Sequence, residues 1–554
     1  MQLQKTVNEF WNLKAQPALM EYIKIPAKST AYDRLWQEHG FLEQCCELGQ
    51  KWIQECLPQA QTEIIREEGR TPCLFVDIPA TRDNSAESVV FYGHLDKQPE
   101  AGGWSEGLGP WTPVVKNGKL YGRGAADDGY SLFSMVTSVY ALEKLNLAHP
   151  RVIGIFETQE ESGSNDLPYF LRKLKHRFGE PKFFIILDNH CGDYDHVWLS
   201  TSVRGVISGT LRVQSMHYGV HSGTYSGMVP DPFSIAQALV ARLHDPVTGF
   251  VKISSCYTDI PKRRLEQLKK ASDVLGDLSW NHAPLLPAVK TKCTTNHEIL
   301  IQETWKPALT IIGVDGMPKI EDAGNVIQSS VAFRLSMRLP PDIDFEKAQN
   351  DIAQTLTTNI PYGCQVTWQY PENHPGWSAK GNSEEIENIF DDAAKKIFGK
   401  EAVFLGQGGS IPIINTFEEL FPSGAFVLTG VLGPQSNAHA PDESLDIEYT
   451  PKAIRSNCRS SASLSLGEKA MRRDVVTEVI VDYGEFVENF ATVLEATDFI
   501  NGNLDELDWP LAAWLEDSSG RKKWDFQIID DGAGGVELVA GEPVKSGSYY
   551  RPIH

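Results

Sequence analysis

Short apolar runs alternate with amphipathic stretches between about Glu63 and Asp188, and this alternation constrains the fold more than any other feature of the sequence. Ser131–Leu145 and Leu167–Phe178 carry helical periodicity. The apolar runs have the length of buried strands, and they are Cys73–Ile78, Val89–His94, Val152–Phe156 and Phe183–Leu187. Strands that alternate with helices predict an α/β, doubly wound mixed sheet with both faces covered. Functional residues of such sheets gather in the loops at the strand carboxyl ends.

The pattern changes after Arg204-Gly205, where a second set of elements begins. Two segments read as helices, Pro232–Leu243 and Phe345–Leu356, and a long irregular stretch extends to about Gly324. The expected strands of this part are Val206–Val213, Val326–Arg338 and Gln365–Tyr370. We therefore expect a smaller α+β lid/dimerisation domain at 209–395, inserted into a catalytic domain formed by 1–208 and 396–498.

The last part of the chain differs again in composition. A helix at Glu384–Phe398 and strands at Val403–Leu405 and Ala425–Leu428 return to the first pattern. Ile454–Leu466 is rich in Ser and Arg and reads as a surface loop, whereas Val475–Leu494 reads as an amphipathic helix. We expect 499–554 to be a C-terminal extension, to which the sequence assigns no role.

Charge and composition narrow the class of protein. A net charge of −22 over 554 residues disfavours nucleic-acid and anionic-membrane partners, because such a surface repels phosphates. No apolar run reaches the ~18–20 residues of a membrane span. The nine cysteines are scattered without a C-x-x-C pair, which is typical of reduced thiols and predicts a cytoplasmic location.

Five short segments concentrate histidines and carboxylates, most of them at an expected strand end. They contain His94 with Asp96, the glycine-rich turn Gly122–Gly129, Glu160-Glu161, Asp188 and His439. Singly, each has an ordinary structural explanation: a core histidine, or adjacent acidic residues on a solvated face. The turn fails as a dinucleotide loop because Asp127-Asp128 would repel a pyrophosphate. Together, the segments supply nitrogen and oxygen ligands of the kind that Zn²⁺ accepts.

These segments resemble the co-catalytic dizinc metallopeptidase family of aminoacylases, carboxypeptidase G, succinyl-diaminopimelate desuccinylase and the carnosine/non-specific dipeptidases. The resemblance covers roughly residues 10–450 and favours the dipeptidase branch. Its motifs are G-H-x-D at Gly93–Asp96, Y-G-R-G-x-x-D-D at Tyr121–Asp128, E-E-x-G-S at Glu160–Ser164, Val203-Arg204-Gly205 after Asp188, H-S-G-x-x-x-G at His221–Gly227, N-V-I at Asn325–Ile327, G-G-S-I-P at Gly408–Pro412 and A-H-x-x-x-E at Ala438–Glu443.

The resemblance implies two divalent metal ions, most simply Zn²⁺, with Mn²⁺ or Co²⁺ as alternatives. It implies that Asp127 bridges the two ions, that Asp96 orients a ligand, and that Glu160 is the general base. The implied metal ligands are His94, Asp127, Glu161, Asp188 and His439.

The resemblance also implies a homodimer, in which His221 of the lid stabilises the oxyanion in the partner subunit. The implied substrate-binding residues are Asn325, Arg338, Gly409 and Ser410. The expected function is metal-dependent hydrolysis of the amide bond of dipeptides or small peptides. N-acyl-amino-acid deacylation and a catalytically weakened binding or scaffold protein are the alternatives.

The sequence departs from the family pattern at two places. The D-D-K-G motif reads Asp127-Asp128-Gly129-Tyr130, and the dipeptidases' R-E-G-G-S reads Gly406-Gln407-Gly408-Gly409-Ser410. These departures leave the substrate preference open. A rival G-x-S-x-G motif at Gly103–Gly107 would suit a serine hydrolase, but the surrounding prolines argue against the helix that must follow it.

Overall fold

The computed structural model describes residues 2–81, 87–277, 285–380 and 383–460, and the strands at 477–482, 487–490, 512–517, 522–530 and 536–543. The chain divides into two compact units, Met1–Ser461 and Ala462–His554. This division falls earlier than position 499, where we expected the C-terminal extension to begin.

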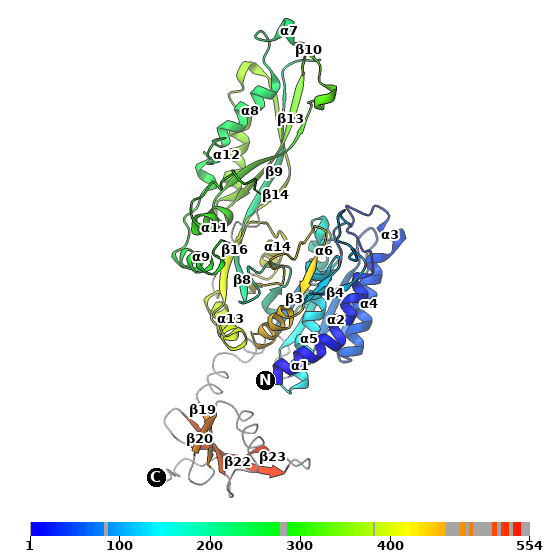
Figure 1. Cartoon of the computed structure of the whole chain (residues 1–554), viewed down its shortest axis with the longest axis vertical. Helices are drawn as coiled ribbons and strands as arrows, with labels where there is room; N and C mark the ends of the chain where they lie inside the picture. Colours follow the sequence, from blue (N-terminus) through cyan, green and yellow to red (C-terminus); the bar gives the residue numbers. More distant parts are fainter. Residues whose placement is uncertain are drawn as a thin grey trace. The chain divides into compact units, whose positions relative to one another are not determined.

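A nine-stranded mixed sheet forms the centre of the first unit (Figure 1). Its strands β6, β3, β7 and β17 run parallel to one another, as does the pair β16 and β8, and the outer strands run antiparallel. In spatial order the strands are β1 Gln61–Ile65, β2 Cys73–Ile78, β6 Arg151–Glu157, β3 Glu87–His94, β7 Glu180–Ile186, β17 Ala425–Leu428, β8 Trp198–Val203 and β15 Trp377–Ser378, with β16 Val403–Gln407 beside β8. The expected α/β sheet is confirmed.

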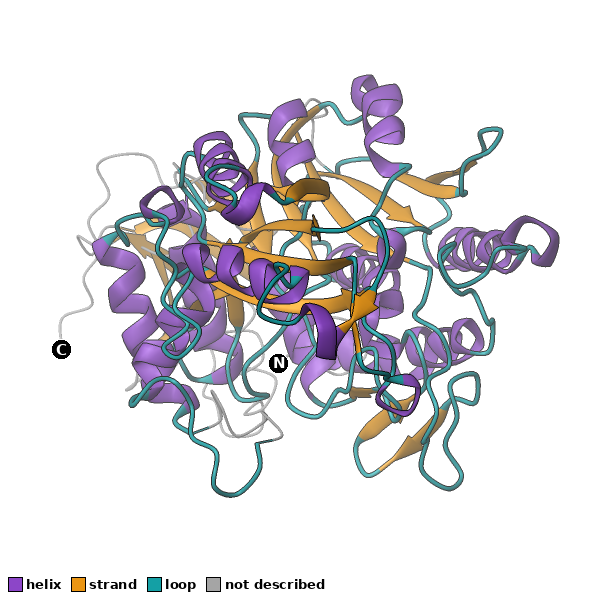
Figure 2. Ribbon diagram, turned by 90° about the horizontal axis from the view of Figure 1, so that it is seen from above, coloured by secondary structure: helices purple, strands orange, loops and turns teal. Residues whose placement is uncertain are grey.

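Helices cover both faces of this sheet (Figure 2), which explains why its strands are continuously apolar. Alternate strand residues such as Phe75 and Val90 pack with one helical layer, and this layer contains α6 Leu167–Leu174 and α14 Ile413–Leu420. The other face packs against α5 Tyr130–Lys144, over which lie α1 Gln2–Phe10, α2 Gln16–Ile23 and α4 Phe41–Cys56.

A four-stranded antiparallel sheet with two helices forms the inserted part, here called the lid. Its strand order is β11 Ala308–Asp315, β13 Ser330–Leu339, β9 Gly205–Gln214 and β14 Gln365–His374. The helices α8 Pro232–Leu243 and α12 Phe345–Thr357 bury their apolar side chains against it. At its far end, a short pair of strands, β10 Val220–His221 and β12 Val326–Ile327, leads into α7 Ser222–Tyr225 (Figure 1).

The stretch expected to be irregular up to Gly324 is instead partly helical, which corrects that prediction. It contains α9 Lys262–Leu275, α11 Asn296–Trp305 and the edge strand β11. Both helices pack beside β16 of the large sheet rather than on the lid sheet. Charged residues are frequent in α9, so its buried Leu268, Ala271 and Leu275 leave only a weak apolar pattern in the sequence.

Two further expectations near the end of the chain are wrong. Residues 449–460 form a helix rather than a surface loop. Ile454 and Cys458, which lie one helical turn apart, are both buried. The segment Val475–Leu494 contains no helix within its described residues; it contributes β19 Thr477–Asp482 and β20 Val487–Phe490. The β-branched run Thr477–Asp482 explains the difference, because such side chains favour strands.

The described strands of the second unit form one antiparallel sheet. Its order is β20, β19, β21 Ala512–Asp517, β22 Lys522–Asp530 and β23 Val536–Pro543. Within the described residues of the whole chain, no helix has the length and apolar character needed to cross a bilayer.

Candidate metal centre

Three neighbouring parallel strands deliver the first side chains of the site. His94 is the last residue of β3, Asp188 follows the end of β7, and Glu160-Glu161 lies in a short turn after β6. These strands are adjacent in the order β6-β3-β7, so their carboxyl ends meet at one edge of the sheet. The expected convergence of strand-end residues is therefore present in the fold.

Asp127 lies between two histidines that are far apart in sequence. Its Oδ1 is 3.1 Å from Nε2 of His94, and its Oδ2 is 3.0 Å from Nε2 of His439. Asp127 comes from the turn before α5, whereas His439 comes from a loop after β17. One carboxylate thus presents each of its oxygens to a different imidazole.

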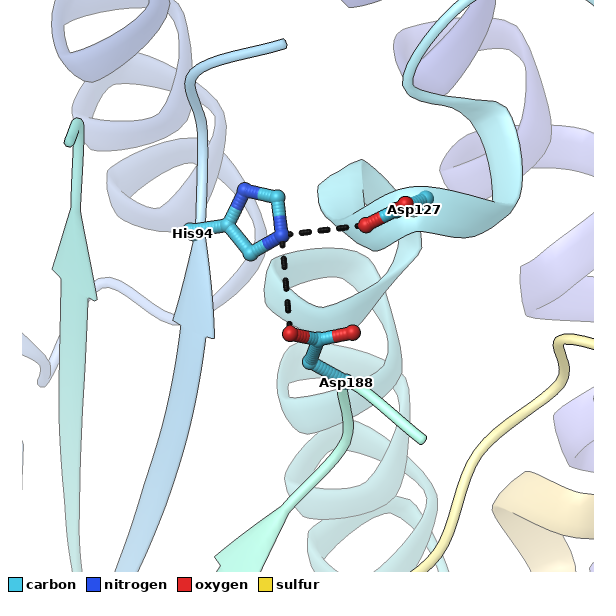
Figure 3. A group of neighbouring side chains, drawn as sticks. All are labelled: His94, Asp127 and Asp188. Atoms are coloured by element: carbon cyan, nitrogen blue, oxygen red, sulfur yellow. Dashed lines mark hydrogen bonds and ion pairs between the residues drawn. The ribbon is translucent and has the colours of Figure 1, made fainter. Parts of the chain in front are cut away.

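A further carboxylate completes each side of this arrangement. Asp188 Oδ2 lies 3.8 Å from Nε2 of His94, and Figure 3 shows both Asp127 and Asp188 directed at that imidazole. Glu161 Oε2 lies 3.1 Å from Nε2 of His439. The ligand atoms of His94, Asp127 and Asp188 form one compact group, and those of Asp127, Glu161 and His439 form another. These are two nitrogen- and oxygen-containing groups that share Asp127, which fits a pair of divalent ions.

Asp96 lies behind His94 and also holds the turn of the two glutamates. Its Oδ1 is 3.5 Å from Nδ1 of His94, and its backbone carbonyl lies 3.1 Å from the same nitrogen. Its two carboxylate oxygens accept hydrogen bonds from the backbone N–H groups of Glu160 and Glu161, each at 3.1 Å. Asp96 is fully buried. It can therefore fix the orientation of one ligand and the backbone position of another.

Crowded carboxylates set the electrostatics of the site. Burial and the negative charge of Asp127 raise the pKa of Asp188 to about 7. Hydrogen bonds that the ring of His439 donates to Asp127 and Glu161 raise the pKa of His439 to about 11. Although its burial opposes this, contacts with both imidazoles lower the pKa of Asp127. Bound cations would relieve this excess of negative charge.

Glu160 faces a cavity of about 370 Å³ beside the two ligand groups. The cavity is lined by Glu160 together with Asp127, Asp188, His439, Asn189, His190, Gln407, Gly409, Ser410, Ile411, Leu432 and Ala438. Burial, followed by the negative charge of Asp188, raises the pKa of Glu160 well above its ordinary value. The cavity beside both ligand groups therefore contains a carboxyl with a raised pKa.

The structure accounts for the missing lysine after Asp127-Asp128. Asp128 turns away from both ligand groups, and its Oδ2 accepts a hydrogen bond from the backbone N–H of His94 at 3.2 Å. A Cβ at Gly129 would lie 2.1 Å from Tyr22 Cε1 and 2.5 Å from the carbonyl oxygen of Gly124. Only glycine fits at position 129, so a lysine there would displace Tyr22 and with it α2.

The expected substrate residues and the expected oxyanion donor His221 lie in two separate places. Arg338 Nη1 donates to Ser410 Oγ at 2.9 Å, and Gly409 and Ser410 line the metal cavity. His221 and Asn325 lie instead at the far end of the lid, where Ser222 N donates to the Asn325 carbonyl. Figure 1 places β10 at the opposite end of the lid from β3. Within one chain, His221 and Asn325 are therefore remote from the ligand groups.

Several residues of the site were not singled out from the sequence. Gln98 donates to Glu161 Oε2 at 2.6 Å, and its position two residues after Asp96 on an extended segment is a signal for it. Arg123 and Glu443 form a buried ion pair at 2.7 Å between the turn of Asp127 and the loop of His439. Both belong to quoted motifs, but neither had been given a role.

The rival G-x-S-x-G segment does not form a nucleophile site. It lies in a loop between β3 and β4 Val114–Lys116, with neither a strand directly before it nor a helix after it. The Ser105 hydroxyl donates to the carboxylate of Asp442 rather than to an imidazole.

Comparisons with known proteins agree with this geometry. The Cys-Gly metallodipeptidase dug1 of Schizosaccharomyces pombe is 26% identical over 393 residues, which cover 68% of this chain and 79% of that protein. The Beta-Ala-His dipeptidase of Homo sapiens is 26% identical over 377 residues, 66% of this chain and 72% of its own length. The crystal structure of human carnosine dipeptidase 1 shares the fold, with a TM-score of 0.65 at 21% identity over 83% of this chain and 98% of that one.

The resemblance to metallopeptidases that the motifs predicted is therefore confirmed. Residues 90–460 match the profile of one protein family, and this range includes every expected ligand. On that match, the chain belongs to peptidase family M20/M25/M40.

Proposed function

We propose that this chain is a zinc-dependent dipeptidase, which hydrolyses the amide bond of small peptides that carry a free carboxylate. The observation that carries the proposal is the position of Asp127, whose two oxygens face His94 and His439 at 3.1 and 3.0 Å. Imidazole and carboxylate ligands suit Zn²⁺, and Mn²⁺ or Co²⁺ would also accept them. The dipeptidase names of the relatives support the choice of substrate.

The residues of the cavity divide the chemistry between them. Two divalent ions held by these ligands would polarise the scissile carbonyl and lower the pKa of the attacking water. Glu160 accepts a proton from that water at its carboxylate and delivers it to the leaving amine, a contribution of about 10²–10⁴-fold. Asp96 holds the backbone of Glu160 in place for this transfer. Arg338, held by Ser410, would bind the substrate carboxylate.

We further propose that the protein acts as a homodimer, with His221 and Asn325 reaching the metal centre of the partner subunit. Their distance from the ligand groups of their own chain supports a role in trans. The edge strand β11 also supports it, because Ile311, Ile312 and Val314 are 42%, 57% and 52% exposed there. An exposed apolar edge strand is a surface on which a second copy can pair.

Complementation between two inactive variants tests the role of His221. His221→Ala should lower kcat by about 10²–10³-fold without loss of metal, as is typical for an oxyanion donor. Mixing it with Glu160→Gln subunits should restore activity, since one site of a mixed dimer keeps both residues. If mixed dimers form and no activity returns, His221 does not act in trans.

The proposed function is tested on the purified full chain. We expect two equivalents of metal and hydrolysis of a dipeptide panel, and Glu160→Gln should keep the metal while losing turnover. N-acyl amino acids in the same panel test the deacylase alternative. A chain that binds metal without hydrolysing either class would be a binding protein instead.

A cytoplasmic location is part of the proposal. All nine cysteines are free thiols, which is usual in a reducing compartment. The net charge of −22 supports the absence of nucleic-acid partners.

A further inference from the structure

A second cavity of about 490 Å³ adjoins the metal cavity. The two share His190, Gln407, Gly409 and Leu432 in their linings. Gln407 donates Nε2 to Ser200 Oγ at 2.7 Å, which holds its side chain at the junction. The positions where the family motif is altered, 406 and 407, thus both line this second space. A substrate at the metal centre can extend into it.

Arg204 supplies a guanidinium to the second cavity. The residue is 9% exposed, and its Nε donates to the Gly408 carbonyl at 3.0 Å. Its Nη1 donates to the carbonyls of Gln302 and Lys306 at 3.4 and 3.2 Å. No described residue accepts a hydrogen bond from Nη2 or forms an ion pair with this side chain. A buried guanidinium with an unused pair of donors favours a carboxylate ligand.

Nη2 of Arg204 lies close to the backbone of Gly408, and both residues line the second cavity. A Cβ at Gly408 would lie 3.2 Å from Arg204 Nη2 and 3.0 Å from Glu303 Cγ, so a larger residue would crowd both side chains. Glu303 is the acidic residue of the same lining, and its negative charge acts on this guanidinium. Burial and the like charge of Arg338 lower the pKa of Arg204 to about 10, so the side chain stays cationic at neutral pH.

Apart from Arg204 and Glu303, the lining has no Asp, Glu, Lys or Arg, and it combines polar with apolar side chains. It includes side chains that suit a short aliphatic stem, among them Trp198, Leu199, Leu275, Leu300 and Leu405. Arg338 is not part of the lining of the second cavity; its Nη1 donates to Ser410 Oγ, and Ser410 lines the metal cavity. The site thus offers one guanidinium for a terminal carboxylate and a second for another anionic group.

We propose that the second cavity binds an acidic side chain on the acyl side of the scissile bond, through Arg204, so that the preferred dipeptides begin with Glu or Asp. This inference rests on the proposed dipeptidase function and names its substrate class. In the reaction, water adds to the scissile carbonyl carbon, the C–N bond breaks, and the amine leaves with the proton.

Matched peptides test the subsite on the metal-loaded full chain. We expect kcat/KM for Glu-Ala to exceed that for the isosteric Gln-Ala by about 10-fold or more, the size of a charge-assisted hydrogen bond. Ala-Glu carries the same charges with the acidic side chain on the amine side, and it should show no such advantage over Ala-Gln.

Two variants should shift the Glu-Ala to Gln-Ala ratio in opposite directions. Arg204→Gln should abolish the preference, whereas Glu303→Gln should increase it about two- to fivefold by removing a competing carboxylate. Glu303→Gln leaves the hydrogen bonds from Arg204 to the backbone carbonyls intact. Its Glu-Ala to Gln-Ala ratio therefore still tests the subsite if Arg204→Gln does not fold.

A wild-type ratio near one, or a decrease in Glu303→Gln, would overturn the subsite while leaving the dipeptidase function in place. Absence of hydrolysis of every dipeptide by metal-loaded protein would overturn the proposed function itself.

Discussion

Glu443 joins the two halves of the metal centre, and replacing it tests how the site is held together. Its Oε1 accepts hydrogen bonds from the backbone N–H groups of Gly124, Ala126 and Asp127 at 2.9, 3.3 and 3.3 Å. Its Oε2 accepts from Arg123 Nη1 at 2.7 Å. Arg123 Nη2 in turn donates to the carbonyl of Ala440 at 3.0 Å, next to His439. One buried ion pair therefore fixes the turn of Asp127 to the loop of His439.

The expected cost of Glu443→Gln follows from the burial of this pair. The side chains of Arg123 and Glu443 are 1% and 0% exposed, so the substitution leaves a guanidinium charged and unpaired inside the protein. Breaking a buried pair on one side costs about 3–5 kcal/mol. Glu443→Ala should cost about 1 kcal/mol more for each backbone N–H left without an acceptor.

The assay combines urea unfolding of the metal-loaded protein with metal analysis. Glu443→Gln should lower the free energy of unfolding and lose metal from both sites, because Asp127 and His439 move together. Asp442→Asn is the matched control: its carboxylate contacts Ser105 on the surface, so it should cost less than about 1 kcal/mol.

A double variant shows whether the loss of the Arg123–Glu443 ion pair causes the expected loss of stability. Arg123→Met with Glu443→Gln removes both charges and should be more stable than Glu443→Gln alone, since no unpaired ion remains. The ion pair does not hold the site together if the free energy of unfolding of Glu443→Gln lies within about 1 kcal/mol of wild type and the variant keeps its full metal content. The same conclusion follows if the loss of stability in the double variant equals the sum of the losses in the two single variants.

Three further outcomes are expected. Asp127→Ala should lose metal from both sites, whereas Asp128→Ala should keep both metals, because only Asp127 faces both imidazoles. Metal analysis of the two variants checks this, and the reverse result would show that Asp128 is the ligand. Arg338→Lys should raise KM for dipeptides by about 10-fold, since it keeps the charge and loses the planar fork, with C-terminally amidated peptides unaffected in the same kinetic assay. Burial raises the pKa of Asp188 to about 7, so below that pH its carboxyl is protonated in the metal-free protein and must release the proton when metal binds. Calorimetry of metal binding in buffers of different ionisation enthalpy should therefore show more protons released at pH 6 than at pH 8. Equal proton release at the two pH values would contradict the raised pKa.

The periodicity of the sequence predicted most elements of the first unit. Pro232–Leu243 is a helix with the predicted bounds, and the expected strand Val206–Val213 lies within β9. These predictions succeed because burial on one or both faces of an element leaves a local repeat of apolar residues. The helix at 449–460 was missed because its buried face includes small serines, which look like loop residues in the sequence.

The candidate ligands could be named from the sequence because each sits in a short motif beside a recognisable strand or turn. Their arrangement could not. The strand order β6-β3-β7-β17 brings together residues more than 300 positions apart. This order allows Asp127 to present Oδ1 to His94 and Oδ2 to His439. Only tertiary structure decides such contacts, because strand order and helix packing are set by the whole core.

The same reason applies to the lid and to the second cavity. His221 and Asn325 carry sequence motifs, yet their place at the far end of the lid follows from the pairing of β10 with β12. The second cavity beside Arg204 arises because α9 and α11 pack against β16. The local sequence around Arg204 does not determine this packing. Local sequence therefore determined which residue types are available for the chemistry, and long-range packing determined which of them share a cavity.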